Sequence, residues 1–411
     1  MTTYLELNTE VTPEHTAVKD EAHRFAEEVL RPASVILDKM TPEEVIAEGS
    51  PHWDVFRAAY ERGLHASGLP EALGGAPLTP LARHMYAEEM GWGSADFAIA
   101  LGVAPFPFSF AAMTGNPDII RDVVMPFAQD KEARYIGCWA ITEPQHGSDA
   151  LLIGSKEFGD AEVAYDLKAR LDGDEWVIRG QKSAWVSNGT IATHALTFLA
   201  VDPDRGMAGS GVALVPLNVP GVSRGKPLDK LGQRALNQGE IFFDDVRIPR
   251  EYMLVQPEAY PFVIDSVLAG ANAGMGACFT GVARAAFEEA LRYTRQRVQG
   301  GKPICEHQAV QLKLMDMFTK VEAARALSRA AMLYNAATTP PATHYSIASK
   351  VFCTQAAFEV ASDALQLHGG YGLAKEMLIE KLFRDARASM IEDGTNEVLS
   401  LAGARRIIDR Y

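Results

Sequence analysis

The sequence predicts a mainly α-helical protein with a block of β-strands in the middle of the chain. Apolar residues recur at three- and four-residue spacing from about residue 13 to 135, at every second position from about 136 to 250, and at helical spacing again after Pro249. A chain of 411 residues exceeds what one hydrophobic core usually organises, so two or three packed units are expected. Because helices and strands are segregated along the chain, a sheet wound from alternating strands and helices is not expected. We therefore predict three domains, at residues 1–135, 136–250 and 251–411.

The N-terminal region is predicted to begin with two helices and a loop. Val18, Phe25 and Leu30 lie on the apolar stripe of the first helix, which we expect to turn or end at Pro32 because proline lacks an N–H group. A second helix is predicted over residues 53–69, with a stop near Gly68. A loop rich in glycine and proline follows at 70–80, and a further helix is expected around 82–92.

The middle region is predicted to be β-structure. Alternating apolar residues from Tyr165 to Leu171 predict a strand, and Trp176 resumes the pattern after a hairpin signal at 172–174. Three more strand-like runs, at 196–201, 211–217 and 240–248, are separated by glycine and proline.

The C-terminal region is predicted to consist of long helices with an interruption at residues 338–342. Its longest apolar stretch runs from Val263 to Phe287. That stretch contains Asp265, Arg284 and many small residues, so we expect a buried helix of a soluble protein and no membrane span.

Charge and cysteine usage exclude several classes of protein. Acidic residues outnumber basic ones by 53 to 39, a formal charge of −14, which argues against a nucleic-acid binder. The four cysteines form no Cys-x-x-Cys pair, so neither a disulfide framework nor a zinc site is expected. The first fifteen residues carry Glu6 and Glu10 but no lysine or arginine, which is not typical of a targeting segment. We expect a cytoplasmic protein.

Residues 138–150 form the first candidate functional segment. An apolar strand leads into Thr142 and Glu143, and then into a turn that contains Gly147 and Ser148. Hydroxyl groups and unpaired backbone N–H groups at such a turn suit a polar ring edge or a phosphate. The alternative is a hairpin that is simply polar.

Residues 180–189 form the second candidate segment. On a strand, Trp185 and Ser187 would face the same side, because one residue separates them. An aromatic wall beside a hydroxyl group suits a planar cofactor. A core tryptophan near a surface serine explains the pattern equally well.

Residues 366–377 form a third, glycine-rich candidate segment. It resembles the beginning of a dinucleotide-binding fingerprint, but Lys375 stands at the third glycine position and the segment follows a helix instead of a strand. A helix-ending glycine loop is the alternative, and it still allows close approach of the backbone to a phosphate.

Residues 389–398 contain two adjacent carboxylates, Glu392 and Asp393, directly before Gly394. Partial burial raises the pKa of a carboxyl group and makes it a better base. A plain turn that caps the following helix is the alternative.

Taken together, these segments resemble the acyl-CoA dehydrogenase family over nearly the whole chain. The run from Thr142 to Asp149 is similar to the family's first signature, and the run from Gln366 to Gly372, followed by Arg384-Asp385, is similar to its second. The run from Gly180 to Trp185 resembles a strand of the family's middle domain. The resemblance implies a helical N-terminal domain, a central β-barrel and a C-terminal four-helix bundle.

The resemblance also implies a noncovalent FAD and a homotetramer. Cofactor contacts are implied for Ile141, Thr142, Gly147, Ser148, Trp185, Ser187, Arg297, Gln299, His307, Gln308, Gln366, Gly369, Gly370, Thr395 and Glu397, some of them across a subunit interface. Substrate contacts are implied for Ser148, Asp265 and Gly394. No metal is implied.

The implied reaction is α,β-desaturation of an acyl-CoA thioester. A carboxylate removes the α-proton, the β-carbon delivers a hydride to flavin N5, and an oxyanion hole holds the enolate oxygen. The usual base is a glutamate directly before Gly-Thr, whereas this sequence has Asp393 there. We assign Asp393 as the base, with Glu392 as the second candidate and Asp96 as the third. Electrons then pass to an acceptor such as electron-transferring flavoprotein.

An aspartate base also resembles dehydrogenases of alicyclic acyl-CoA thioesters and nitroalkane oxidases of the same superfamily. Its side chain is shorter by one methylene, roughly 1.5 Å of reach. We therefore expect a cyclic or branched acyl group, with a flavin oxidase or monooxygenase as the alternative function and a non-enzymatic assembly partner as another. Leu268 replaces an arginine that is frequent in the family, and Gly300 replaces an aromatic residue, which affects the expected CoA and FAD contacts.

Overall fold

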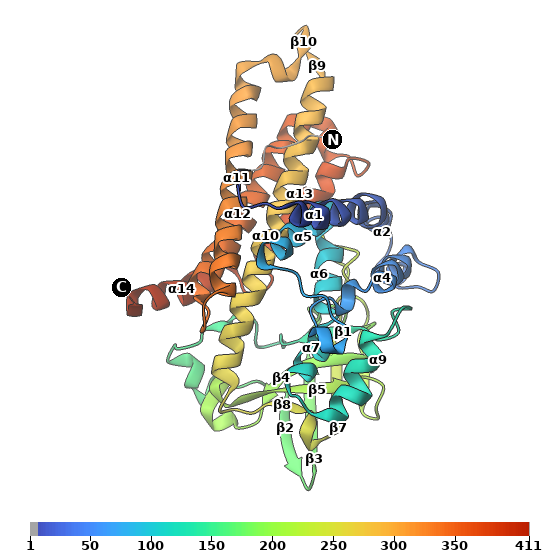
Figure 1. The fold of residues 1–411 in the computed structure, drawn as a ribbon, viewed down its shortest axis with the longest axis vertical. Helices are drawn as coiled ribbons and strands as arrows, with labels where there is room; N and C mark the ends of the chain where they lie inside the picture. Colours follow the sequence, from blue (N-terminus) through green and yellow to red (C-terminus); the bar gives the residue numbers. More distant parts are fainter. Residues whose placement is uncertain (1–6, 411) are drawn as a thin grey trace.

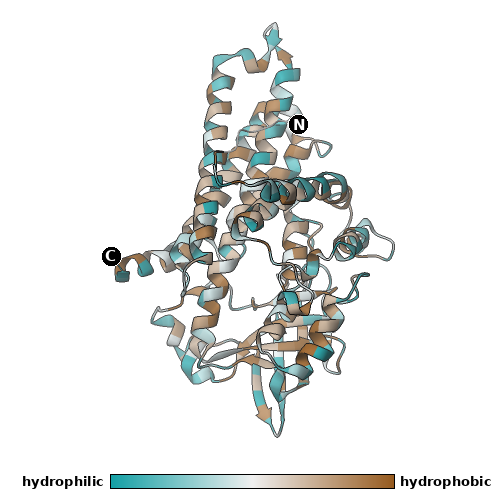
Figure 2. Cartoon of the chain, viewed as in Figure 1, coloured by the Kyte–Doolittle hydropathy of each residue, from teal (hydrophilic) through white to brown (hydrophobic). Residues whose placement is uncertain are grey.

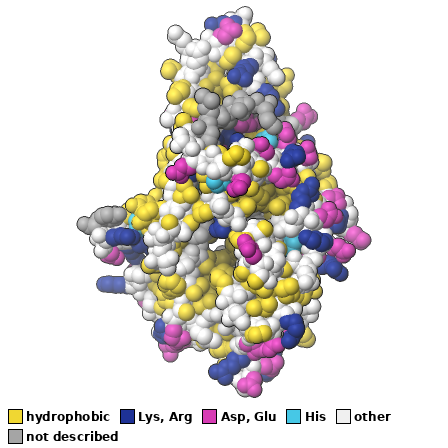
Figure 3. Space-filling model, in the orientation of Figure 1, with side chains coloured by type: hydrophobic (Ala, Val, Ile, Leu, Met, Phe, Trp, Pro, Cys, Tyr) yellow, Lys and Arg dark blue, Asp and Glu magenta, His cyan; other side chains and the backbone are white. Residues whose placement is uncertain are grey.

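The computed structural model describes residues 7–410 and places a β-sheet at one end of an elongated molecule (Figure 1). Long helices of the C-terminal region run from the sheet along the longest axis, and the N-terminal helices cover one side of them. Residues 1–6, which belong to the segment considered for targeting, and Tyr411 lie outside the described part. Acidic and basic side chains are interspersed over the face seen in Figure 3.

The structure contains fourteen α-helices and ten β-strands within the described residues. The helices are α1 Pro13–Phe25, α2 Arg31–Leu37, α3 Pro42–Val45, α4 Pro51–Glu61, α5 Pro80–Gly93, α6 Ala95–Val103, α7 Phe106–Met113, α8 Pro117–Ile119, α9 Met125–Ala128, α10 Tyr260–Gln296, α11 Gln308–Ala336, α12 Thr343–His368, α13 Leu378–Ser389 and α14 Asn396–Arg410. The strands are β1 Gly137–Ala140, β2 Lys168–Asp172, β3 Glu175–Lys182, β4 His194–Ala200, β5 Ser210–Pro216, β6 Val222–Arg224, β7 Ile241–Pro249, β8 Met253–Val255, β9 Val298–Gln299 and β10 Lys302–Pro303.

Two helix boundaries in the N-terminal region differ from the predictions. The first helix continues past Pro32, because a π-helical turn at Ala26–Leu30 joins α1 to α2 and the N–H of Arg31 bonds to the carbonyl of Ala26. This wider turn accommodates the proline without a break. The second helix ends at Glu61, well before Gly68, since Gly63 adopts a left-handed φ of 72° that terminates α4.

The predicted hairpin is confirmed, with Asp172 opposite Glu175 and Gly173 at a φ of 65° in the turn. The strands pair in the order β6-β7-β3-β2-β4-β5-β8, with β1 parallel to β4. The expectation of a closed β-barrel is corrected: β6 and β8 are three-residue edge strands, and no pairing between them is present in the described chain. The sheet curves around a common apolar cluster without closing.

Helix α10 forms the centre of the helical bundle and contacts α5, α11, α12 and α13. The bundle helices carry apolar residues along their length (Figure 2). Two stretches, α10 and Ala95–Met113, are long and apolar enough to cross a membrane by composition, and about half of each is buried inside the protein. Gly281 permits the contact between α10 and α5, since a Cβ there would lie 1.9 Å from the carbonyl oxygen of Glu88.

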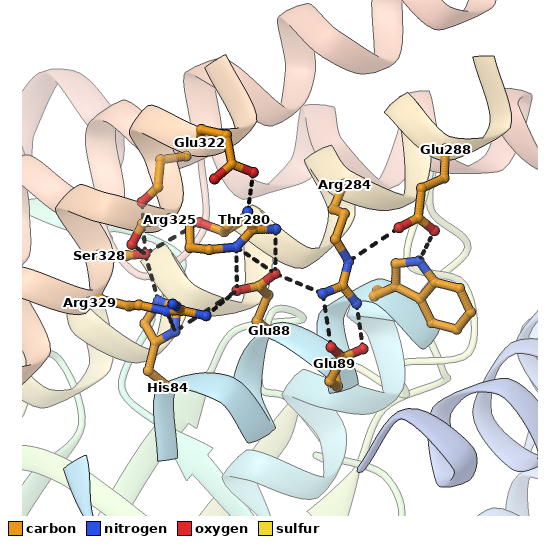
Figure 4. Close-up of polar contacts among 12 residues, drawn as sticks. His84, Glu88, Glu89, Thr280, Arg284, Glu288, Glu322, Arg325, Ser328 and Arg329 are labelled. Carbon is orange, nitrogen blue, oxygen red and sulfur yellow. Dashed lines mark hydrogen bonds and ion pairs between the residues drawn. The ribbon is translucent and has the colours of Figure 1, made fainter. Parts of the chain in front are cut away.

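A buried network of charges joins the N-terminal region to the bundle (Figure 4). Arg284 of α10 donates to Glu88 and Glu89 of α5, at 2.8 Å each, and Arg325 of α11 donates to Glu88 at 2.9 Å. Burial alone would raise the pKa of Glu88, but Arg325 and Arg284 hold it well below its ordinary value. In the sequence, the adjacent glutamates at 88 and 89 in an apolar helix are the one signal of this network.

Candidate active site between the sheet and the bundle

The two adjacent carboxylates lie on a tight turn between α13 and α14. Asp393 has a φ of 52° and Gly394 a φ of 92°, both in the left-handed region. The Thr395 hydroxyl accepts a hydrogen bond from the N–H of Val398 at 3.3 Å and thereby caps α14. The segment therefore forms the turn and helix cap that was the alternative prediction. The strained backbone of this turn sets the direction of the Glu392 and Asp393 side chains.

Gly394 cannot be replaced without disturbing its surroundings. A Cβ at this position would lie 2.8 Å from Leu151 and 2.9 Å from Leu399, and the φ of 92° disfavours any other residue. Leu151 follows the first signature turn, so the glycine allows the sheet region and the bundle to approach each other at this point.

Asp393 is the unrestrained carboxylate of the turn. No hydrogen bond or ion pair connects its carboxylate to another residue between positions 7 and 410. Solvent reaches the side chain, yet the protein packed around the turn removes part of its hydration. This burial raises the pKa of Asp393, and the charge of Lys350 opposes the rise. Asp393 is therefore free to accept a proton from a bound molecule.

Glu392 is held in place by the loop that precedes β7. The Gln233 side-chain amide donates to the Glu392 carboxylate at 2.7 Å, and the Gln233 backbone N–H donates to Asp385 at 2.5 Å. Burial and the neighbouring Asp393 raise the pKa of Glu392 to about 7, although Gln233, Lys350 and Lys230 act in the opposite direction. The Glu392 carboxylate is thus restrained by Gln233, whereas the Asp393 carboxylate is not restrained.

Asp96 has a structural role. It is completely buried and accepts hydrogen bonds from Ser34 at 3.0 Å, from the Ala235 N–H at 3.2 Å and from Lys381 at 3.1 Å. Burial would raise its pKa, but Lys381 and the hydroxyl donors lower it to about 2. A carboxylate whose oxygens already accept several hydrogen bonds and whose pKa is this low is a poor base. Asp96 is therefore not a good candidate for the catalytic base.

The first signature turn is fixed by a buried ion pair. Lys182 of β3 donates to the Glu143 carboxylate at 2.7 Å and to the carbonyl of Ile141 at 2.9 Å. Glu143 also accepts the backbone N–H groups of Asp166 and Leu167. His146 and Asp166 approach Glu143 closely enough to suggest a metal site, but these bonds already occupy the Glu143 carboxylate. The pair positions Thr142 and the residues after it.

Trp185 lies on a turn after β3, and Ser187 is half-buried and forms isolated β-bridges with Trp139 and Gln238, so the predicted continuous strand is not present here. The Trp185 side chain is 56% exposed. The Gln238 amide donates to the Trp185 carbonyl and to the Ser187 hydroxyl, at 3.2 Å each. An exposed indole beside a hydroxyl group, held by one glutamine, suits a planar ring. Gln238, Gln233 and Lys350 were not predicted, because no local sequence pattern marks residues that act through the tertiary fold.

The remaining predicted cofactor contacts lie far from this site. Helix α10 has 37 residues, about 55 Å at 1.5 Å per residue, and its far end leads into β9 and β10 (Figure 1). There the His307 ring bonds to the Gln299 carbonyl at 2.9 Å. One chain therefore does not bring this end together with Ser148. The predicted contacts at this end and at the C-terminus of α12 are Arg297, Gln299, His307, Gln308, Gln366, Gly369 and Gly370.

Asp265 lies near the start of α10 and is paired within the chain. It accepts a hydrogen bond from Thr343 at 3.0 Å and forms an ion pair with Arg406 of α14. Leu268, one turn further along, is 3% exposed and belongs to an apolar cluster with Leu399. The arginine that the family often carries at position 268 is thus replaced here by a core residue, and Arg406 supplies a positive charge nearby.

The match to known proteins covers all three regions of the chain. Residues 12–131, 138–246 and 263–408 match the N-terminal, middle and C-terminal domains of acyl-CoA dehydrogenase. The mitochondrial short-chain specific acyl-CoA dehydrogenase of Bos taurus is 33% identical over 98% of this chain and 92% of the relative. The structure of butyryl-CoA dehydrogenase from Megasphaera elsdenii is 26% identical, covers 98% of this chain and 100% of its own, and superposes with a TM-score of 0.84. A nitroalkane oxidase at 23% identity, with a TM-score of 0.86 over 98% of this chain and 97% of its own, shares the fold. The predicted family and its overall fold are confirmed, and the chain belongs to the acyl-CoA dehydrogenase family of oxidoreductases.

Proposed function

We propose that this protein is an FAD-dependent acyl-CoA dehydrogenase in which Asp393 removes the α-proton of an acyl-CoA thioester. The observation that carries the proposal is the unrestrained Asp393 carboxylate on a turn that is bonded to the first signature through Ser148. A thioester acidifies its α-hydrogen, and a partly dehydrated carboxylate with a raised pKa is suited to accept it.

The residues around this turn fit an isoalloxazine ring and its ribityl chain. Trp185 offers an exposed aromatic ring, and the Ser183 N–H, two residues before it, bonds to the carbonyl of Thr142, so the segments that carry the Thr142, Ser148 and Ser187 hydroxyl groups are joined. With Ile141, Gly147, Thr395 and Glu397, these residues would hold the cofactor. When bound, FAD accepts the hydride that leaves the β-carbon of the substrate.

The turn also supplies hydrogen-bond donors for the thioester. Thr395 uses its backbone N–H on Ser148, whereas the N–H groups of Asp393 and Gly394 meet no acceptor among residues 7–410. A free N–H beside the base is suited to hold the carbonyl oxygen as it gains negative charge during proton removal. Gly394 lets the thioester approach this backbone closely.

The shorter base favours a cyclic or branched acyl group. An aspartate ends roughly 1.5 Å closer to its own backbone than a glutamate does. A substrate whose α-carbon is held nearer to the turn compensates for this difference, and a ring fills more of the pocket than a linear chain. Asp265 and Arg406, which are paired near the start of α10, would contact the CoA portion.

A second copy of the chain completes the cofactor site in this proposal. The residues at the far end of the bundle, including Arg297 and His307, would contact the FAD of another subunit. Exposed apolar side chains such as Leu312 and Met315 on α11 and Ile408 on α14 would be covered in a homotetramer. We expect a cytoplasmic enzyme that is not bound to a membrane and that transfers its electrons to an electron-transferring flavoprotein.

Anaerobic addition of acyl-CoA thioesters to the FAD-loaded protein tests the proposal. Linear, branched, alicyclic and aromatic-side-chain thioesters should be compared at equal concentration, and we expect the alicyclic or branched ones to bleach the flavin fastest. If no thioester reduces the flavin while a nitroalkane does so and dissolved oxygen forms peroxide, the protein is an oxidase on this scaffold instead.

A further inference from the structure

A lysine of α12 lies buried directly beneath the turn that carries Asp393. The side chain of Lys350 is 0% exposed, and its Nζ donates to the carbonyl of Gly394 at 2.8 Å and to the Asn396 side chain at 2.9 Å. The Asn396 amide in turn donates to Thr354, one helical turn further along α12, at 3.1 Å. Lys350 and Thr354 of α12 therefore hold the part of the turn that follows Asp393, at Gly394 and Asn396.

The charge of Lys350 is not required for these hydrogen bonds. A neutral amide also donates to a carbonyl, whereas a buried ammonium loses most of its hydration. The carboxylates that attract it belong to Asp393, Glu392 and Glu397. Burial lowers the pKa of Lys350 to about 8, so the group is charged at neutral pH and becomes neutral in mildly alkaline solution.

We propose that Lys350 is a positioning residue for the base: its hydrogen bonds fix the left-handed turn, and its charge keeps Asp393 ionised until a substrate binds. This inference rests on the proposed function of Asp393. The other ionisable groups that face the pair are Glu392 on the same turn, Glu397 on α14, Lys230 on the loop before β7 and the thiol of Cys278 on α10. Among the charged groups outside the turn that the structure describes, Lys350 of α12 is the one that forms hydrogen bonds to it.

Three substitutions separate the charge from the hydrogen bonds. Lys350→Gln keeps a hydrogen-bond donor without the charge, Lys350→Met removes both, and Lys350→Arg keeps the charge. Lys313→Met is the matched control, because Lys313 of α11 pairs with Asp363 far from the turn. Flavin content and thermal unfolding establish which variants fold.

The pH dependence of flavin reduction by an acyl-CoA is the first readout. Loss of a nearby positive charge raises the pKa of a carboxylate, so the acid limb should move up by about one pH unit in Lys350→Gln and Lys350→Met. At pH values below the limb, the variants should reduce the flavin about tenfold more slowly than the wild type. Near pH 9, Lys350→Gln should approach the wild-type rate, because Lys350 has lost its own charge there. Lys350→Arg and Lys313→Met should keep the wild-type limb.

Infrared titration of the substrate-free protein is the second readout and does not depend on activity. The carboxylic C=O band that disappears in Asp393→Asn should titrate about one unit higher in Lys350→Gln than in the wild type. An unchanged midpoint in a folded Lys350→Gln protein overturns the inference. If no thioester reduces the wild-type flavin, the proposed function is overturned. If the Asp393 band nevertheless titrates higher in Lys350→Gln than in the wild type, the effect of Lys350 on Asp393 stands.

Discussion

The backbone N–H of Thr395 donates a hydrogen bond to the hydroxyl of Ser148 at 2.9 Å. The two residues are 247 positions apart, and each belongs to one of the segments that mark the site in the sequence. Through this contact, the turn that carries Asp393 is tied to the turn that follows β1. The position of the base is thus coupled to the position of the groups that would hold the flavin.

Replacing Ser148 by alanine should loosen this connection without unfolding the protein. The substitution leaves the Thr395 N–H without its acceptor, which should cost about 1–2 kcal/mol of stability. We expect the rate of flavin reduction to fall about tenfold, because a displaced base turn misaligns the proton transfer. Stopped-flow reduction and urea unfolding measure the two effects. Ser67→Ala, which removes a hydroxyl bonded to Leu64 in the N-terminal region, is the control, and an equal loss of rate there would contradict this account.

Gly394→Ala and Gly74→Ala form a matched pair for the strain at the base turn. Both glycines have a φ near 90°, 92° and 87° respectively, so alanine should cost about 1–2 kcal/mol at either position. Only at Gly394 would the new Cβ meet Leu151 and Leu399, which should add about 1–3 kcal/mol. Chemical denaturation of both variants measures the difference. Equal destabilisation would show that the close approach at Gly394 has no energetic consequence.

Glu392 should make the stability of the protein depend on pH in the acidic range. Its pKa is raised from the ordinary value of 4.5 to about 7, chiefly by burial, so the folded state binds this proton more tightly than the unfolded chain does. Stability should therefore fall as the pH rises from 4.5 to 7. Glu392→Gln should lack this dependence, and the difference between the two proteins should change by on the order of 2 kcal/mol across the window. Urea unfolding at pH 5 and pH 7 measures it; parallel curves for both proteins would contradict the raised pKa.

Glu88→Gln should destabilise the protein strongly. The substitution removes the carboxylate that pairs with Arg284 and Arg325 and leaves two buried guanidinium groups poorly compensated. Breaking a buried pair in this way costs about 3–5 kcal/mol. Arg57→Met, which breaks an exposed pair with Asp54, should cost less than about 1 kcal/mol. Thermal unfolding compares them, and similar losses would mean that the buried network does not stabilise the contact between α5 and α10.

Local periodicity sufficed to predict where the helical and strand regions lie. The hairpin at Gly173 was predictable because its turn residues and the apolar alternation agree. The continuation of the first helix past Pro32 could not be predicted, because a π-helical turn depends on how the helix packs and leaves no local sequence signature. The open sheet was also missed, because closure depends on the pairing of the edge strands and not on their presence.

The candidate site was predictable only where its residues are local in sequence. Asp393, Gly394 and Ser148 stand in recognisable segments, so their chemistry was expected. Gln233 and Lys350 come from a loop and a helix with no such pattern, and only the fold places them against the base turn. The position directly before Gly394 already favoured Asp393 over Glu392, and the bond from Gln233 to Glu392 adds a tertiary reason for the same choice.

Rapid mixing of anaerobic FAD-loaded protein with a reactive acyl-CoA shows whether Asp393 is the base. Asp393→Asn should retain flavin and bind the thioester, yet reduce the flavin at least about a thousandfold more slowly, because the amide cannot accept the α-proton. Glu392→Gln should stay within about tenfold of the wild type, since its carboxyl group is restrained by Gln233. The opposite order, with Asp393→Asn active and Glu392→Gln inactive, would contradict the assignment.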